Sequence, residues 1–168
     1  FNEVAEKTSL EFLGLVPSGI DLTAAEMELA QVEKREYRLR EALMPAYPLY
    51  DYVLIDCPPS LGLLTLNGLV ASDSIIVPLQ CEYYALEGLS KLLQTVSRVR
   101  SGLIPNLETE GVLLTMFDSR TSLAKQVASD VNENFQGKIF DTVIPRNIRL
   151  SEAPSFGKPV IQYDIGSK

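Results

Sequence analysis

The chain has 168 residues, of which 46% are hydrophobic, and this is enough for one domain with a buried core. Its net charge of −7 argues against a surface coated with basic side chains for nucleic acid, although it is compatible with a local basic patch. The sequence has no histidine, which excludes a histidine-based catalytic triad and a histidine metal site.

Composition also bears on the compartment. No apolar run approaches the roughly 18 residues of a membrane span, and the start lacks the basic-then-apolar pattern of a signal peptide. Cys57 and Cys81 show neither disulfide nor zinc spacing, which favours a reducing environment. We therefore expect a cytoplasmic protein.

The first predicted elements are a strand and a long helix. Residues Leu10–Val16 are mostly apolar and run into a Pro-Ser-Gly turn, which predicts a strand. Apolar residues then recur at helical spacing over Leu22–Leu43, with charges interleaved, and the prolines that follow would end this helix. Thr23 and Glu26 have the spacing of a capping box, with Asp21 as a rival N-cap.

The rest of the chain alternates between strands and helices. The predicted strands are Tyr52–Asp56, Ile75–Leu79, Gly111–Thr115, Ile139–Ile144 and a short one near Val160–Ile161. The predicted helices are Gly62–Ala71, Ala85–Arg100 and Ser122–Phe135, and a loop rich in proline, arginine and serine separates the last two strands. This order predicts an α/β fold with right-handed crossovers: a three-layer, doubly wound, mostly parallel sheet in a single domain over residues 1–168.

The strand Tyr52–Asp56 carries the first candidate site. It is apolar at every position before the acid, as in a strand buried on both faces, and Asp56 falls at the edge where open α/β sheets bind ligands. A carboxylate there can hold the water shell of a Mg²⁺ beside a nucleotide phosphate, or it can merely cap the next turn. Pro58 and Pro59 then force a stiff loop, so the segment has the form of a Walker B strand with a phosphate-sensing switch loop.

Two further strand ends carry candidate binding residues. Gln80–Tyr84 could line a nucleotide cleft or a dimer face, or only connect a strand to a helix. Met116 and Phe117 are suited to sandwich a purine base, with a role in the core as the alternative. Arg120 follows them and is not suited to the core.

The loop after the strand Ile139–Ile144 is rich in polar groups. Arg146 and Asn147 could contact a nucleotide or a partner subunit, and Arg149 could contact a DNA phosphate. An ordinary solvated loop is the alternative, because arginines are common on surfaces.

Together these blocks resemble the ParA family of plasmid and chromosome partitioning ATPases, especially its chromosomal Soj branch. The resemblance covers nearly all of the chain and is carried by Tyr52–Gly62, Gln80–Gly88, Gly111–Arg120 and Ile144–Pro159, with Asp21–Leu43 similar to the segment before the family's Walker B strand. It implies a P-loop NTPase-like fold, ATP and Mg²⁺ as cofactors, and a bacterial, nucleoid-associated protein. The partners it implies are a second copy of the chain, non-specific DNA and a centromere-binding protein, ParB, that stimulates hydrolysis.

The resemblance also implies roles for single residues. Asp56 matches the Walker B aspartate, associated with Mg²⁺ through water when nucleotide is present, and Pro58, Pro59 and Gly62 match the switch II loop. The residues that match positions around the adenine are Met116, Phe117, Pro145 and Asn147, and those that match DNA-binding positions are Arg120 and Arg149.

One part of the family pattern is missing. The P-loop motif Gly-x-x-x-x-Gly-Lys-Ser/Thr occurs nowhere in the 168 residues, and neither does the aspartate-bearing strand that follows it in the family. We expect a chain trimmed at both ends relative to the family, lacking the P-loop strand. Because P-loop amides and lysines supply most of the phosphate cradle, we expect negligible ATP hydrolysis and no tight cofactor binding by these residues alone.

Two other interpretations stay open. The first is a non-catalytic interaction module of the same descent, which dimerises through its switch face without nucleotide. The second is a MinD-like positioning ATPase, which an amphipathic C-terminal helix would target to membranes. The block Pro145–Pro154 fits the Soj branch better, so we expect no membrane partner.

Overall fold

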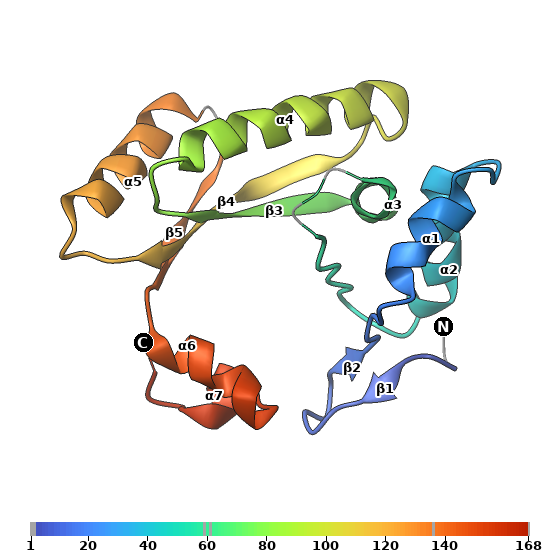
Figure 1. The fold of residues 1–168 in the computed structure, drawn as a ribbon, viewed down its shortest axis with the longest axis horizontal. Helices are drawn as coiled ribbons and strands as arrows, with labels where there is room; N and C mark the ends of the chain where they lie inside the picture. The colour runs from blue at the N-terminus through green and yellow to red at the C-terminus, as the bar shows by residue number, and fades with distance from the viewer. Residues whose placement is uncertain (1–2, 59, 61, 136, 168) are drawn as a thin grey trace. The chain divides into compact units, whose positions relative to one another are not determined.

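The computed structural model describes residues 3–58, 60, 62–135 and 137–167, and its contacts divide the chain into two compact units (Figure 1). The first unit comprises residues 1–73 and 95–107, and the second comprises residues 74–94 and 108–168. Helix α4, Ala85–Gly102, begins in the second unit and ends in the first.

The second unit is built on a parallel sheet. Its strands are β3 (Ser74–Gln80), β4 (Glu108–Phe117) and β5 (Ile139–Pro145), hydrogen-bonded in the order β3-β4-β5. Both neighbouring pairs are parallel. The predicted α/β fold with a parallel sheet is therefore confirmed, and β4 is longer than expected at both ends.

Helices α4 and α5 (Ser122–Asn134) cover one face of this sheet (Figure 1). Because side chains alternate along a strand, Val77 and Leu79 point into the core, while Ile76, one residue before Val77, is 51% exposed. The buried residues of this core are Val77, Leu79, Cys81, Leu89, Val112, Leu114, Ala124, Val127 and Val131.

The helices of this core form where the sequence predicts them. The apolar positions of α5 recur three and four residues apart, which places them on one face, and the Thr121 hydroxyl caps the helix by accepting from the N–H of Ala124 at 3.3 Å. In α4, Lys91 Nζ lies 2.6 Å from Glu87 Oε1, as the spacing of four residues predicts.

The first unit is made of short helices and a hairpin. The elements are β1 (Glu6–Lys7), β2 (Gly14–Leu15), α1 (Leu22–Leu29), the 3₁₀ turn η1 (Arg35–Tyr37), α2 (Arg38–Leu43), the 3₁₀ turn η2 (Met44–Ala46) and α3 (Leu63–Ala71). The prediction of α3 is confirmed. The prediction of one continuous helix over Leu22–Leu43 is wrong, because α1 ends at Leu29 and Lys34, just before η1, adopts a left-handed conformation (φ 51°) that no α-helix contains.

The predicted strand Leu10–Val16 is also wrong over most of its length. Only Gly14 and Leu15 are in a strand, and they pair antiparallel with β1. The Thr8 hydroxyl bonds the carbonyl of Leu13 at 2.9 Å and accepts from the N–H of Leu10 at 3.1 Å. These local bonds hold the residues between them in a turn, away from any strand ladder.

The segment Tyr52–Asp56 differs most from its prediction. Within the described residues it belongs to no helix and to no sheet. Tyr52 and Leu54 are 87% and 88% exposed, whereas Ile55 is half-buried. A strand needs a neighbouring strand to pair with its backbone N–H and C=O groups. No strand among the described residues pairs with this segment, so its apolar pattern does not produce a strand.

The end of the chain is helical where a loop and a strand were predicted. Its elements are α6 (Ile148–Glu152), the 3₁₀ turn η3 (Ala153–Phe156) and α7 (Val160–Tyr163). The predicted strand at Val160–Ile161 is wrong. Instead, the N–H of Tyr163 bonds the carbonyl of Pro159 at 3.0 Å, and its ring stacks on Phe156 at 4.9 Å between centroids.

Candidate functional site

Asp56 is exposed at the end of the segment Tyr52–Asp56, and the side chain of Cys57 packs against α3. Although Cys57 as a whole is exposed, its Sγ packs where a Cβ on Gly68 would collide with it, so the thiol itself is desolvated. Burial raises the pKa of the Cys57 thiol, and the negative charge of Asp56 adds to the rise. The segment is thus anchored to α3, with the Asp56 carboxylate near the Cys57 sulfur.

The predicted switch loop is tied to the same helix. The Thr65 hydroxyl lies 2.5 Å from the carbonyl oxygen of Ser60 and 3.3 Å from that of Pro58, and Thr65 is buried. Gly62 is the N-cap residue of α3. Pro59, also predicted to belong to this loop, lies outside the described residues.

The donor set around Asp56 fits Mg²⁺ only in part. Among the described residues no group of three or more acidic, cysteine or histidine side chains could hold a metal ion. Mg²⁺ usually keeps several waters and binds through one or two carboxylates together with substrate phosphates. Asp56 can supply one such carboxylate, so the ion would depend on a bound nucleotide.

The ends of β4 and β5 bring together three of the predicted nucleotide-binding residues. Phe117 pairs with Pro145 in the sheet register, and the N–H of Arg146 donates to the carbonyl of Phe117 at 3.0 Å. Met116 has φ 53°, a left-handed conformation that is rare for a residue with a long side chain. Such backbone strain is typical of functional sites, and here it lies at the carboxyl edge of the sheet.

Arg120 is held by Asp118 on the surface beside this edge. Its Nε and NH2 donate to the two carboxylate oxygens at 2.9 and 2.7 Å, and its backbone N–H also bonds the carboxylate at 3.0 Å. These hydrogen bonds hold the pKa of Asp118 well below its usual range, so the carboxylate stays ionised. The Arg120 side chain nevertheless is 85% exposed, which leaves it open to a second anion.

Asn147 is the N-cap residue of α6, and Arg149 lies in its first turn. Asn147 Oδ1 accepts from the N–H of Arg149 at 2.8 Å as the helix cap, and its Nδ2 donates to Ser167 Oγ at 2.7 Å. Arg149 pairs with Glu152 at 2.8 Å and with Asp164 at 3.3 Å. The predicted DNA-binding arginines are therefore both paired with carboxylates, and α6 replaces the predicted loop.

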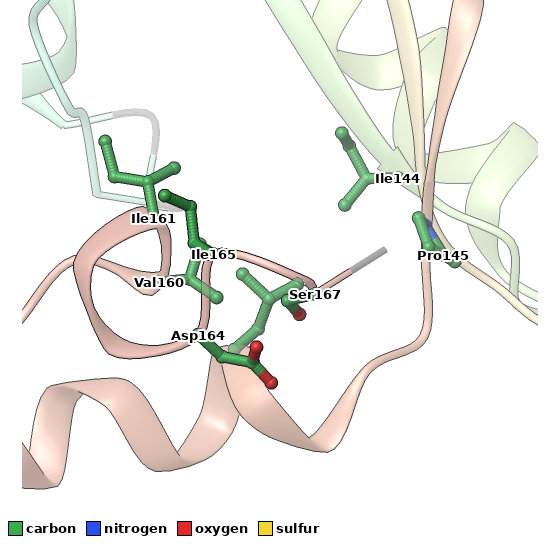
Figure 2. A pocket seen from close by; sticks show the side chains of 8 residues that line it. Ile144, Pro145, Val160, Ile161, Asp164, Ile165 and Ser167 are labelled. Atoms are coloured by element: carbon green, nitrogen blue, oxygen red, sulfur yellow. The ribbon is translucent and has the colours of Figure 1, made fainter.

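A shallow apolar hollow of about 220 Å³ lies between the end of β5 and α7 (Figure 2). Ile144 and Pro145 form one side of it, opposite the isoleucines of the C-terminal segment. A carboxylate in its wall, that of Asp164, is unfavourable for a phosphate, so the hollow suits an apolar group. The lining residues are Ile144, Pro145, Leu150, Val160, Ile161, Asp164, Ile165 and Ser167.

Sequence reasoning missed several residues whose side chains make hydrogen bonds around these sites. Thr65 and Asn67 are buried polar side chains of α3, whose bonds reach other segments. Glu26 is predicted as part of a local capping box but instead bonds the backbone of Leu64. Glu152 sits three residues after Arg149 on a helix, and that spacing could have predicted their pairing had the helix been recognised.

Comparison with known proteins decides the family. The family model for an AAA domain matches residues 1–109. The chromosome partitioning protein ParA of Myxococcus xanthus is 58% identical over 166 residues, and the sporulation initiation inhibitor protein Soj of Bacillus subtilis is 55% identical over 166 residues. The chain belongs to the ParA/Soj family. Both matches extend over 99% of this chain, but the chain spans only 59% of the Myxococcus protein and 66% of the Bacillus protein.

Solved structures support the P-loop NTPase fold. Cobyrinic acid a,c-diamide synthase from Mycobacterium smegmatis, with bound ADP and magnesium, is 37% identical with a TM-score of 0.81, over 94% of this chain and 69% of that one. The cell division ATPase MinD of Pyrococcus furiosus has a TM-score of 0.76 at 20% identity, over 99% of this chain and 64% of that one, and shows the fold alone. No helix in the described part of the chain is long and apolar enough to cross a membrane.

Proposed function

We propose that the protein containing these residues is a chromosome or plasmid partitioning ATPase, which dimerises with ATP, binds DNA without sequence specificity and is stimulated by a ParB-type partner. The observation that carries the proposal is 58% identity to a chromosome partitioning ParA along 99% of this chain. Asp56 and the loop anchored by Thr65 support it, because both lie in the first unit, as a Walker B acid and its switch loop would.

The cofactor proposal is ATP with Mg²⁺. A structural relative at 37% identity holds an ATP analogue and magnesium. In this chain Asp56 would hold the ion through water, Gly62 would belong to the switch loop with its prolines, and Met116, Phe117, Pro145 and Asn147 would surround the base. The name of that relative points to a synthase, and the higher identity to partitioning proteins favours partitioning.

The 168 residues by themselves should not hydrolyse ATP, because they contain no P-loop motif and so no phosphate cradle. Phosphate release with these residues should stay at the level of buffer, with and without a ParB-type protein and DNA. Stimulated turnover by this chain alone would contradict the proposal of inactivity.

DNA binding should depend on Arg120 and Arg149. In the full-length gene product with ATP, replacing both by alanine should weaken DNA retention, and each lost phosphate contact should reduce the salt slope of log K by about 0.9. Fluorescence anisotropy with a labelled duplex at several salt concentrations measures both quantities.

The matched control is Arg98→Ala, which removes an exposed arginine of α4 outside these clusters. It should leave the affinity and the salt slope unchanged. An Arg120→Ala/Arg149→Ala protein that binds DNA with the wild-type affinity and salt slope would rule out these residues as the contacts.

A further inference from the structure

Glu26 of α1 contacts the start of α3, although 38 residues separate it from its partner in the chain. Its Oε1 accepts from the backbone N–H of Leu64 at 3.2 Å, in the first turn of the helix. The first amides of a helix have no partner within it, and the N-cap Gly62 has no side chain to bond them. Glu26 therefore supplies the cap from another helix, with a charge that suits the helix dipole.

Gly62 supports this contact by a separate observation. Its backbone is extended, with φ −81° and ψ −173°, a conformation that any residue adopts, so the backbone does not require glycine. A Cβ at this position would collide with Glu26 Oε1. The missing side chain thus leaves the space that the carboxylate occupies.

Two more polar side chains of α3 make hydrogen bonds inside the first unit. Thr65 bonds the carbonyl of Ser60 in the switch loop, and Asn67, 4% exposed, bonds the backbone of Arg35 and Leu39 at 3.0 and 3.1 Å. The helix therefore joins the loop after Asp56 to the helical segments that precede Tyr52.

We propose that Glu26 is a positioning residue for the switch loop. Its carboxylate fixes the start of α3, where the loop ends at Gly62, and so couples a nucleotide-driven change in the loop to helix α1. The coupling rests on the proposed function, since it needs a nucleotide at the loop. The contact itself needs only the fold. Glu26 acts through its hydrogen bond with the backbone of Leu64.

The contact is tested first, by amide hydrogen exchange in the 168-residue chain. Glu26→Ala should speed exchange of the Leu64 amide by about 2- to 10-fold, as expected for the loss of one hydrogen bond, whereas Glu26→Gln keeps an acceptor and should restore most of the protection. Glu28→Ala, an exposed glutamate of the same helix, is the matched control and should change nothing. Wild-type exchange of Leu64 in Glu26→Ala would overturn the inference.

Gly62→Ala provides a second variant that leaves Glu26 in place. It should speed Leu64 exchange in the wild-type background, because the methyl group displaces the carboxylate. In the Glu26→Ala background the same change should have a smaller effect. Equal effects of Gly62→Ala in both backgrounds would overturn the link between the glycine and the carboxylate.

The coupling is tested in the full-length gene product, with and without ATP and Mg²⁺. In the wild type and in Glu26→Gln, nucleotide should alter exchange both around Ser60 and in α1. In Glu26→Ala the change around Ser60 should persist while the change in α1 is lost, which a simple loss of stability would not produce. A response retained in α1 of Glu26→Ala overturns the coupling alone. A wild-type protein that ignores ATP overturns the coupling and the proposed function together.

Discussion

The thiol of Cys57 reports on the carboxylate beside it. Burial and the charge of Asp56 both raise the pKa of the thiol. At a given pH, a smaller fraction of Cys57 is therefore thiolate than for an ordinary cysteine. Asp56→Asn removes the second cause. We expect the pKa of Cys57 to fall in this variant, and its alkylation by iodoacetamide at pH 8 to be faster than in the wild type.

The measurement is a pH profile of alkylation, resolved by peptide mass spectrometry. Cys81 serves as an internal control, because burial alone raises its pKa and it should not respond to the substitution. Unchanged profiles for Cys57 in Asp56→Asn would mean that the carboxylate does not act on the sulfur as the structure indicates.

Helix α3 is stabilised by the buried side chain of Asn67, a residue type that is usually found on the surface. Asn67 is buried and makes hydrogen bonds to Arg35, Leu39 and Leu63. Asn67→Ala leaves these backbone groups without their partner, so we expect the free energy of unfolding to fall by about 1–3 kcal/mol in urea titrations. Asn132→Ala, on the exposed side of α5, should change it by less than about 0.5 kcal/mol. Equal losses in both variants would contradict the role of Asn67.

Local patterns predict the elements that depend on local contacts. The apolar spacing of α5 and its cap at Thr121 are set within a few residues, and the sequence predicts this helix within one residue. Lys34 has a left-handed backbone within the predicted helix Leu22–Leu43, and a lysine in the sequence gives no indication of that conformation. The contact of Glu26 with Leu64 crosses 38 residues, so only the tertiary structure could reveal it. Phe117 and Pro145, which the family resemblance assigns to the base site, are neighbours in the sheet register, while their contact with a nucleotide stays a prediction.

At the scale of the whole molecule, α4 links the two units through one continuous helix. Leu89 is buried in the second unit, and Val96 and Val99 are buried farther along the same helix. We therefore expect residues 1–168 to unfold as a single domain, with coincident urea transitions by far-UV circular dichroism and tyrosine fluorescence.

The control for this prediction is a break in the helix. Gln94→Pro, at an exposed position in α4, should cost about 3 kcal/mol or more and separate the two transitions, whereas Gln94→Ala should leave them coincident. Separate transitions in the wild-type chain would show that the units unfold independently.

The exposed segment Tyr52–Leu54 has a practical consequence for anyone who purifies this chain. Because the segment pairs with no strand among the described residues, a strand of another copy can pair with it, and its exposed tyrosine and leucine side chains favour such encounters. Concentrated solutions should therefore scatter more light with time. A Leu54→Lys substitution, which puts a charge on this edge, should keep the chain dispersed at concentrations where the wild type precipitates.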